Sequence, residues 1–66
     1  ADAVRVLKQA AALAPDHPAL NYHLGAAYAK VGQRPDAITH LKKAIASGMP
    51  FDGLEQARTL LGEIAG

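Results

Sequence analysis

The chain contains no cysteine and no tryptophan, and its aromatic residues are two tyrosines and one phenylalanine among 66 residues. Without cysteine there is no disulfide to cross-link a small fold and no thiolate to act as a nucleophile or metal ligand. A chain of this length forms one domain at most and buries a smaller share of its surface than larger domains do. We therefore expect helix packing or association, not covalent links, to supply its stability.

A strong charge of either sign is also missing. Seven lysines and arginines stand against six aspartates and glutamates, which gives a formal net charge of +1. Nucleic-acid and acidic-membrane surfaces are usually marked by a strong basic excess, so no nucleic-acid partner is expected. No apolar run approaches the roughly 18 residues that a membrane span needs, and no signal-peptide pattern precedes Ala1. The expectation is a soluble segment, in the cytoplasm or the periplasm.

Short breaks divide the chain into helical stretches. Proline and glycine cluster at residues 15–18, 32–35 and 48–53. Between these breaks apolar residues recur at helical spacing, prolines open the second and third stretches, and glycines follow their ends. The expected helices span residues 2–14, 18–31, 35–47 and 52–66. Asp52 and Glu55, in the last stretch, have the spacing of a capping box, and the predicted fold class is all-α.

The first and third helical stretches repeat one another at a distance of 34 residues. The identical pairs are Asp2 and Asp36, Ala3 and Ala37, Leu7 and Leu41, Lys8 and Lys42, Ala10 and Ala44, and Ala12 and Ala46. Aspartate, leucine and lysine coincide as well as alanine, so alanine content alone does not explain the match. A period of this length in helical sequence indicates an array of helix pairs.

The stretch between the two copies carries a second, independent pattern. Asn21, Leu24, Gly25 and Tyr28 have the spacing Trp, two residues, Leu-Gly, two residues, Tyr, with Asn21 in place of the aromatic. With the 34-residue period, this pattern resembles the tetratricopeptide repeat family, which implies antiparallel helix hairpins stacked as a fragment of an α-solenoid. The residues that carry the resemblance are Leu24, Gly25, Tyr28, Ala37, Leu41, Ala44, Ala3, Leu7, Ala10 and Pro15. Asn21 offers less packing area than an aromatic, so looser packing is expected there.

In the terms of that family the chain divides into three parts. Residues 2–17 resemble the second helix of one repeat, residues 18–51 a complete repeat, and residues 52–66 a terminal helix that caps the stack. The last part leaves the pattern, because Glu55 and Arg58 stand where the aromatic and the leucine would be. It also resembles the C-terminal repeats of large bacterial proteins of exopolysaccharide and protein-sorting systems, through Phe51-Asp52-Gly53, Ala57-Arg58 and Leu60-Leu61.

Packing explains several of the conspicuous residues. Glycine inside a helix costs about 1 kcal/mol relative to alanine, so Gly25 is expected to allow close approach of a neighbouring helix. Ala37 and Ala44 are the surfaces expected to approach it. In the last break, Met49 and Phe51 are expected to cover the end of the core.

No motif for catalysis or metal binding is found. His17, His23 and His40 include no pair at i, i+4 spacing, and no cysteine or carboxylate cluster completes a ligand set. No serine or acid stands at the spacing of a catalytic motif, so neither enzyme activity nor a cofactor is expected. His40 is expected to lie beside Asp36, one turn earlier.

If the family geometry holds, the exposed positions of the second helix line a concave groove. These positions are Ala19, Tyr22, Ala26, Ala29 and Lys30. Tyr22 is the best candidate anchor because it offers area, rigidity and a hydroxyl, and Lys30 is placed to meet an acidic group. The alternatives are that Tyr22 packs against a neighbouring helix and that Lys30 is only solvated. Tyr22 and Ala26 stand where the family's carboxylate-clamp variety has lysine and asparagine, which argues against recognition of an acidic C-terminal peptide.

The sequence therefore predicts a non-catalytic scaffold module that binds a protein or peptide and forms part of a longer array. One alternative is an assembly module, because the first helix lacks its usual partner and leaves Val6, Leu7 and Ala10 partly uncovered. Such a chain would form homo-oligomers or exchange helices between copies. The other alternative is an accessory segment of a larger bacterial envelope or exopolysaccharide-system protein whose active site lies elsewhere.

Overall fold

The computed structural model describes residues 2–65, and the regular structure within that range is helical. The helices are α1 (Asp2–Leu13), α2 (Pro18–Lys30), α3 (Arg34–Ala46) and α4 (Leu54–Ala65). The prediction of four helices in an all-α fold is confirmed, and the bounds differ from the expected ones by one or two residues. No helix in this described part of the chain is both long and apolar enough to cross a membrane.

The ends of α2 follow from the local sequence. Pro18 occupies the first helical position, and the His17 ring accepts a hydrogen bond from the backbone N–H of Leu20 at 3.3 Å, which caps the helix. At the other end Gly32 has φ of 82°, a left-handed conformation that glycine adopts without steric cost. The N–H of Gln33 then bonds back to the carbonyl of Tyr28 at 2.9 Å, so the chain reverses directly into α3.

The start of α4 corrects one expectation. The predicted capping box at Asp52 is wrong, because the helix begins at Leu54 and the cap position belongs to Gly53, whose carbonyl accepts the first helical hydrogen bond from Ala57 at 2.7 Å. Glu55 pairs instead with Arg58, one turn along, at 3.2 Å. Both side chains are largely exposed, so this pair adds little to stability.

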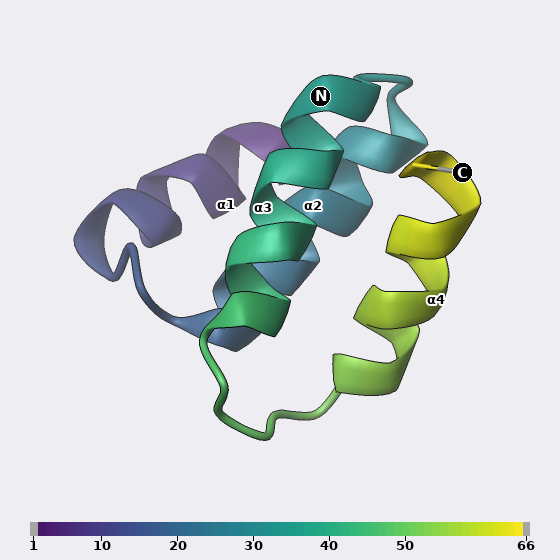
Figure 1. The fold of residues 1–66 in the computed structure, drawn as a ribbon. Helices are drawn as coiled ribbons and strands as arrows, with labels where there is room; N and C mark the ends of the chain where they lie inside the picture. The colour runs from purple at the N-terminus through teal and green to yellow at the C-terminus, as the bar shows by residue number, and fades with distance from the viewer. Residues whose placement is uncertain (1, 66) are drawn as a thin grey trace.

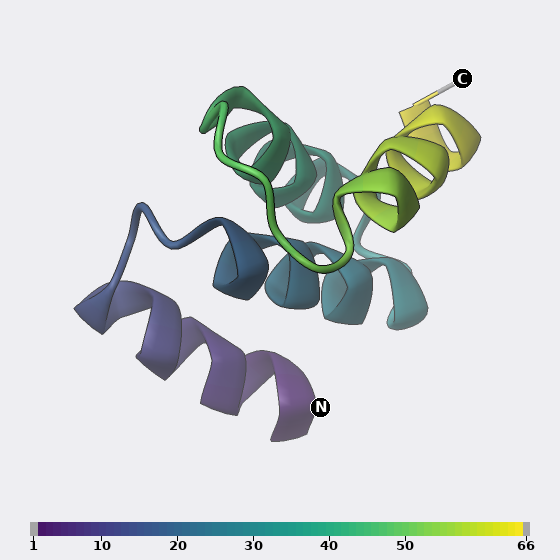
Figure 2. The ribbon, with the colours of Figure 1, turned by 90° about the horizontal axis from the view of Figure 1, so that it is seen from below.

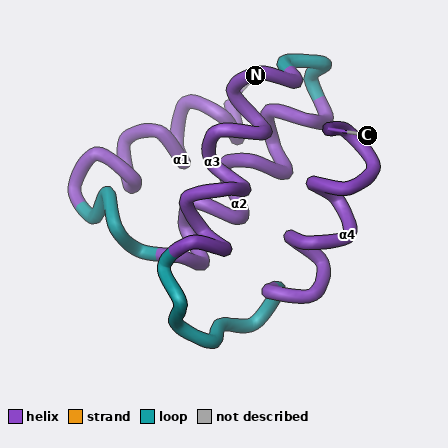
Figure 3. Tube along the Cα trace, viewed as in Figure 1, coloured by secondary structure: helices purple, strands orange, loops and turns teal. Residues whose placement is uncertain are grey.

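The four helices are arranged around α2, which packs against each of the other three. Figure 1 shows α3 lying along α2, with α1 on one side of this pair and α4 on the other. Seen from below, α1 and α3 flank α2 on different sides, and α4 stands beside α3 (Figure 2). The connections between the helices are loops and turns (Figure 3). The chain therefore consists of consecutive helix hairpins stacked side by side.

Small residues and two leucines form the centre of the packing. Leu24 and Leu41 are the largest fully buried side chains, and Ala37, Ala44 and Ala57 have no exposed area. Among the remaining residues of the repeat pattern, Gly25 and Tyr28 are buried, Leu7 and Ala10 are half-buried, and Ala3 and Pro15 are exposed. A Cβ atom on Gly25 would lie 2.8 Å from Leu41 Cγ and 3.2 Å from the carbonyl oxygen of Ala37. The absence of a side chain at Gly25 thus lets α2 and α3 lie this close.

The sequence suggested looser packing at Asn21. In the structure, however, this residue is buried and fully hydrogen-bonded. Only 2% of it is exposed. Its amide nitrogen donates to the carbonyl oxygens of Pro15 at 3.0 Å and His17 at 3.2 Å, which ties the α1–α2 turn to α2. The amide oxygen of Asn21 can only accept a hydrogen bond. In its 3.1 Å contact with Nδ1 of His40, this ring nitrogen must therefore carry the proton and donate it.

His40 therefore has a different partner from the one expected. Its ring bonds to Asn21 and stacks on Tyr28, with centroids 5.6 Å apart and planes inclined by 22°, so Asp36 is not its main contact. Burial lowers the pKa of His40, the positive charge of Lys43 lowers it further, and Asp36 raises it in part. The ring is thus neutral at pH 7, in keeping with its role as a single-proton donor to Asn21.

The loop before α4 brings a second correction. Met49 was expected to cover the end of the core, but it is 52% exposed. Phe51 is half-buried and packs on Tyr22 instead, with ring centroids 6.2 Å apart. The loop contacts α2 through the packing of Phe51 on Tyr22, and Met49 remains exposed.

Candidate functional site

An apolar hollow lies along α2 on the side that faces α4. It encloses about 590 Å³, within the usual range for ligand sites. Its lining combines small side chains of α2, two aliphatic side chains of α4 and one alanine of α1. The lining residues are Ala3, His23, Ala26, Ala27, Ala29, Lys30, Leu60 and Ile64. We call this hollow the α2–α4 groove.

Three of the five residues predicted for the groove line it. Ala26 and Ala29 contribute to its floor, and Lys30 lies near the end of α2 with an exposed side chain. Ala19 is half-buried and does not belong to the lining. Tyr22 lines a neighbouring hollow of about 430 Å³, which shares Leu60 with the groove.

The ring of Tyr22 is engaged within the chain. It packs on Phe51 at an inclination of 44°, and a Cβ atom on Gly53 would lie 2.7 Å from Tyr22 Cε2. The turn before α4 can therefore lie this close to the Tyr22 ring because Gly53 has no side chain. Tyr22 is half-buried, and these contacts are with the loop before α4, whereas the alternative expectation was packing against a neighbouring helix. Part of its ring thus fixes the position of α4.

Sequence reasoning missed the second wall of the groove. Leu60 and Ile64 stand one turn apart on α4, and neither was among the predicted groove residues. Ile64 packs against the core, yet both side chains also line the groove. Their helical spacing is visible in the sequence, but the way in which α4 packs against α2 is not.

The chemistry that the groove offers is non-covalent. Its floor is made of alanines, which let a bound backbone approach α2 closely, and its walls are aliphatic. Among the described residues that line it, His23 and Lys30 are the titratable ones, and none is a carboxylate. Within residues 2–65 no three His, Cys, Asp or Glu side chains gather as a metal site would require. Such a lining favours an apolar side chain with an anionic or polar group beside it.

Comparison with known proteins gives one match. A family model described as tetratricopeptide repeat matches residues 1–50, which contain α1, α2 and α3. No curated protein and no solved structure matches the chain. The matched range ends before α4, where the sequence pattern also departs from the repeat.

Proposed function

Because this chain belongs to the tetratricopeptide repeat family, we propose that it is a binding module that holds a peptide segment of another protein in the α2–α4 groove. The observation that carries this proposal is the apolar hollow of about 590 Å³ with an alanine floor. A groove of this size accepts one or two medium-sized apolar side chains. Lys30 and His23 at its edge favour a peptide with an acidic group next to those side chains.

The repeat boundaries belong to the same proposal. We take α1 as the second helix of one repeat, residues 18–51 as a complete repeat, and residues 52–66 as a terminal helix. The identities at 34-residue spacing between α1 and α3 support this division. The exposed Glu55–Arg58 pair supports the role of α4, because a terminal helix needs one polar face.

Filling the groove is the test of this function. The change from alanine to leucine at Ala26 places a bulky side chain on the groove floor, whereas Lys42→Leu adds the same side chain to an exposed position on α3. Peptides are first selected on the unmodified chain from a displayed random library, and their affinities are then measured by calorimetry. We expect Ala26→Leu to weaken binding by about tenfold or more, since displaced apolar contacts cost about 1–3 kcal/mol, and Lys42→Leu to leave it unchanged.

The proposal fails if the library yields no binder. It also fails if the selected peptides bind the Ala26→Leu and Lys42→Leu chains with equal affinity.

A second function, self-assembly, is favoured by the unequal burial of two equivalent helices. The counterparts at 34-residue spacing are Ala3 and Ala37, Leu7 and Leu41, and Ala10 and Ala44. In α3 all three residues have no exposed area, since both α2 and α4 pack against this helix. In α1 the alanine at position 3 is exposed and the other two are only half-buried. We propose that this face of α1 associates with a second copy of the chain.

The self-assembly proposal predicts a concentration-dependent mass. Val6 is 56% exposed and Leu13 is 89% exposed on α1, and glutamate at both positions should abolish association by placing charge on that surface. Met49→Glu, at another exposed apolar residue, is the matched control and should still associate. Sedimentation should show a weight-average mass that rises above 6.9 kDa with concentration. A constant 6.9 kDa at the highest attainable concentration contradicts the proposal.

A further inference from the structure

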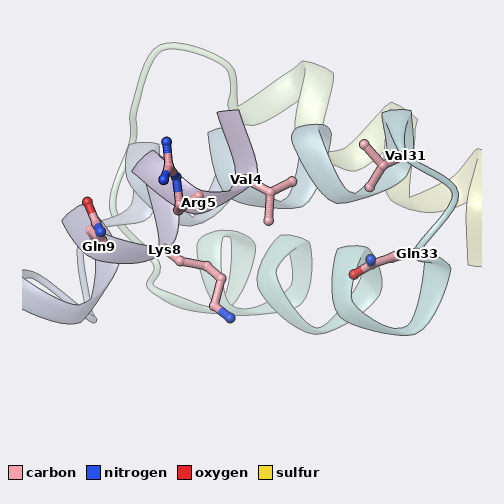
Figure 4. Close-up of a pocket in the computed structure, with 6 residues that line it drawn as sticks. All are labelled: Val4, Arg5, Lys8, Gln9, Val31 and Gln33. Carbon is pink, nitrogen blue, oxygen red and sulfur yellow. The ribbon is translucent and has the colours of Figure 1, made fainter. Parts of the chain in front are cut away.

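A second set of hollows lies between α1 and α3, and its lining differs from that of the α2–α4 groove. The first hollow, of about 460 Å³, is lined by Val4, Arg5, Lys8, Gln9, Val31 and Gln33 (Figure 4). The second, of about 220 Å³, shares Lys8 with the first and is also lined by His40 and Lys43. The third, of about 400 Å³, shares Lys43 with the second. Because neighbouring hollows share lining residues, we treat them as one α1–α3 cleft.

Positive charge predominates in this cleft. Arg5, Lys8 and Lys43 line it, whereas Asp16, in the third hollow, is the one carboxylate that lines it within residues 2–65. Arg5 is partly compensated by Asp2, an exposed partner at 3.4 Å. The chain as a whole carries only +1, so this local excess comes from the arrangement of the helices and not from composition.

The two lysines converge from different helices. Lys8 extends from α1 toward α3 in Figure 4, and Lys43 stands on α3 beside the same 220 Å³ hollow. Lys43 is close enough to His40 to lower the pKa of the ring, which is already lowered by burial. Asp36 on α3 acts in the opposite direction but does not line the hollow. An anion between Lys8 and Lys43 would therefore meet two cations and a partly desolvated surface.

Apolar and amide groups separate the cations along the cleft. Val4 and Val31 lie in the first hollow and Ala11 in the second, while Gln9 and Gln33 offer amide groups that can bond to a peptide backbone. A nucleic-acid site requires a much denser basic surface, with aromatic side chains that stack on bases. A protein segment that carries both acidic and small apolar side chains matches the chemistry of these groups better.

We propose that the α1–α3 cleft binds an acidic, partly apolar peptide segment of a partner protein, whose carboxylates lie between Lys8 and Lys43. This site lies on a different side of α2 from the α2–α4 groove and does not depend on it. One chain thus presents two separate peptide surfaces, one mainly apolar and one cationic.

The test uses a defined probe, an eight-residue peptide that alternates glutamate with alanine or leucine, titrated into the full chain and followed by NMR. We expect signal changes at Lys8, His40 and Lys43, and a rise in the pKa of His40, because a bound carboxylate offsets the charge of Lys43 that lowers this pKa. Neutralising both cations in a Lys8→Gln, Lys43→Gln chain should weaken binding by about tenfold or more through loss of charge-assisted contacts. Both lysines are exposed, so the fold should be retained.

Two controls make the test specific. Lys42→Gln removes an exposed lysine next to Lys43 and should bind the probe as the unmodified chain does. Lys30→Gln removes the lysine of the α2–α4 groove and should leave the signal changes at Lys8, His40 and Lys43 in place. A version of the probe with glutamine in place of glutamate should not bind. Equal loss of affinity in the Lys42→Gln chain overturns the proposal. So do signal changes confined to the α2–α4 groove, or binding of inorganic phosphate or a single-stranded oligonucleotide without binding of the acidic peptide.

Discussion

Replacing Leu41 with alanine is expected to unfold a large fraction of the chain. Leu41 has no exposed area and lies against the position that a side chain at Gly25 would occupy. Truncating a fully buried leucine costs about 2–5 kcal/mol, because the lost contacts leave a cavity. At about 0.05–0.15 kcal/mol per residue, a chain of 66 residues has only about 3–10 kcal/mol of stability to lose.

The measurement is urea denaturation followed by circular dichroism, at a protein concentration at which the chain is monomeric, with Leu13→Ala as the matched control. Leu13 is 89% exposed, so its truncation should change the free energy of unfolding by no more than about 0.5 kcal/mol. If both variants unfold at the same urea concentration as the unmodified chain, Leu41 does not hold α2 and α3 together.

The second large effect is expected at Gly25, where alanine should destabilise the chain although alanine favours helix. A new Cβ atom would lie 2.8 Å from Leu41 Cγ, 3.0 Å from Leu41 Cδ2 and 3.2 Å from the backbone oxygen of Ala37. Leu41 is enclosed, and the Ala37 oxygen cannot move without shifting α3. Overpacking of this kind costs about 1–3 kcal/mol, against roughly 1 kcal/mol gained in helix propensity. We expect a net loss of up to about 2 kcal/mol.

The helices and their repeat could be predicted from the sequence because the signals are local. Pro18 and Gly32 mark the two ends of α2 through fixed backbone preferences, and the tyrosine at position 28 follows at the signature spacing. The 34-residue identities depend on the order of residues alone. None of these inferences required knowledge of how the helices cross.

The polar contacts at the centre could not be predicted in the same way. Asn21 was taken as a weak substitute for an aromatic, yet it joins the α1–α2 turn to His40, which is 19 positions away. Whether a buried asparagine is satisfied depends on carbonyls and rings that come together only in the folded chain. The resemblance indicated the position of Asn21 but not its partners.

Both proposed binding surfaces illustrate the same limit. The α2 side of the groove was expected from the resemblance to the repeat family, whereas Leu60 and Ile64 became part of it because of the way α4 packs. The α1–α3 cleft joins Lys8 and Lys43, which are far apart in the sequence and belong to different helices. Helix spacing predicts which residues share a face, but not which faces meet.

The most direct test of the close approach between α2 and α3 is to compare Gly25→Ala with Gly62→Ala in denaturation experiments. Gly62 lies within α4, where a Cβ atom would have no neighbour within 4 Å, so alanine there should raise the free energy of unfolding by up to about 1 kcal/mol. We predict opposite signs, with Gly25→Ala unfolding at a lower denaturant concentration than the unmodified chain and Gly62→Ala at a higher one. If Gly25→Ala is stabilising to the same extent as Gly62→Ala, the two helices do not meet at Gly25, and the stacked-hairpin account is contradicted.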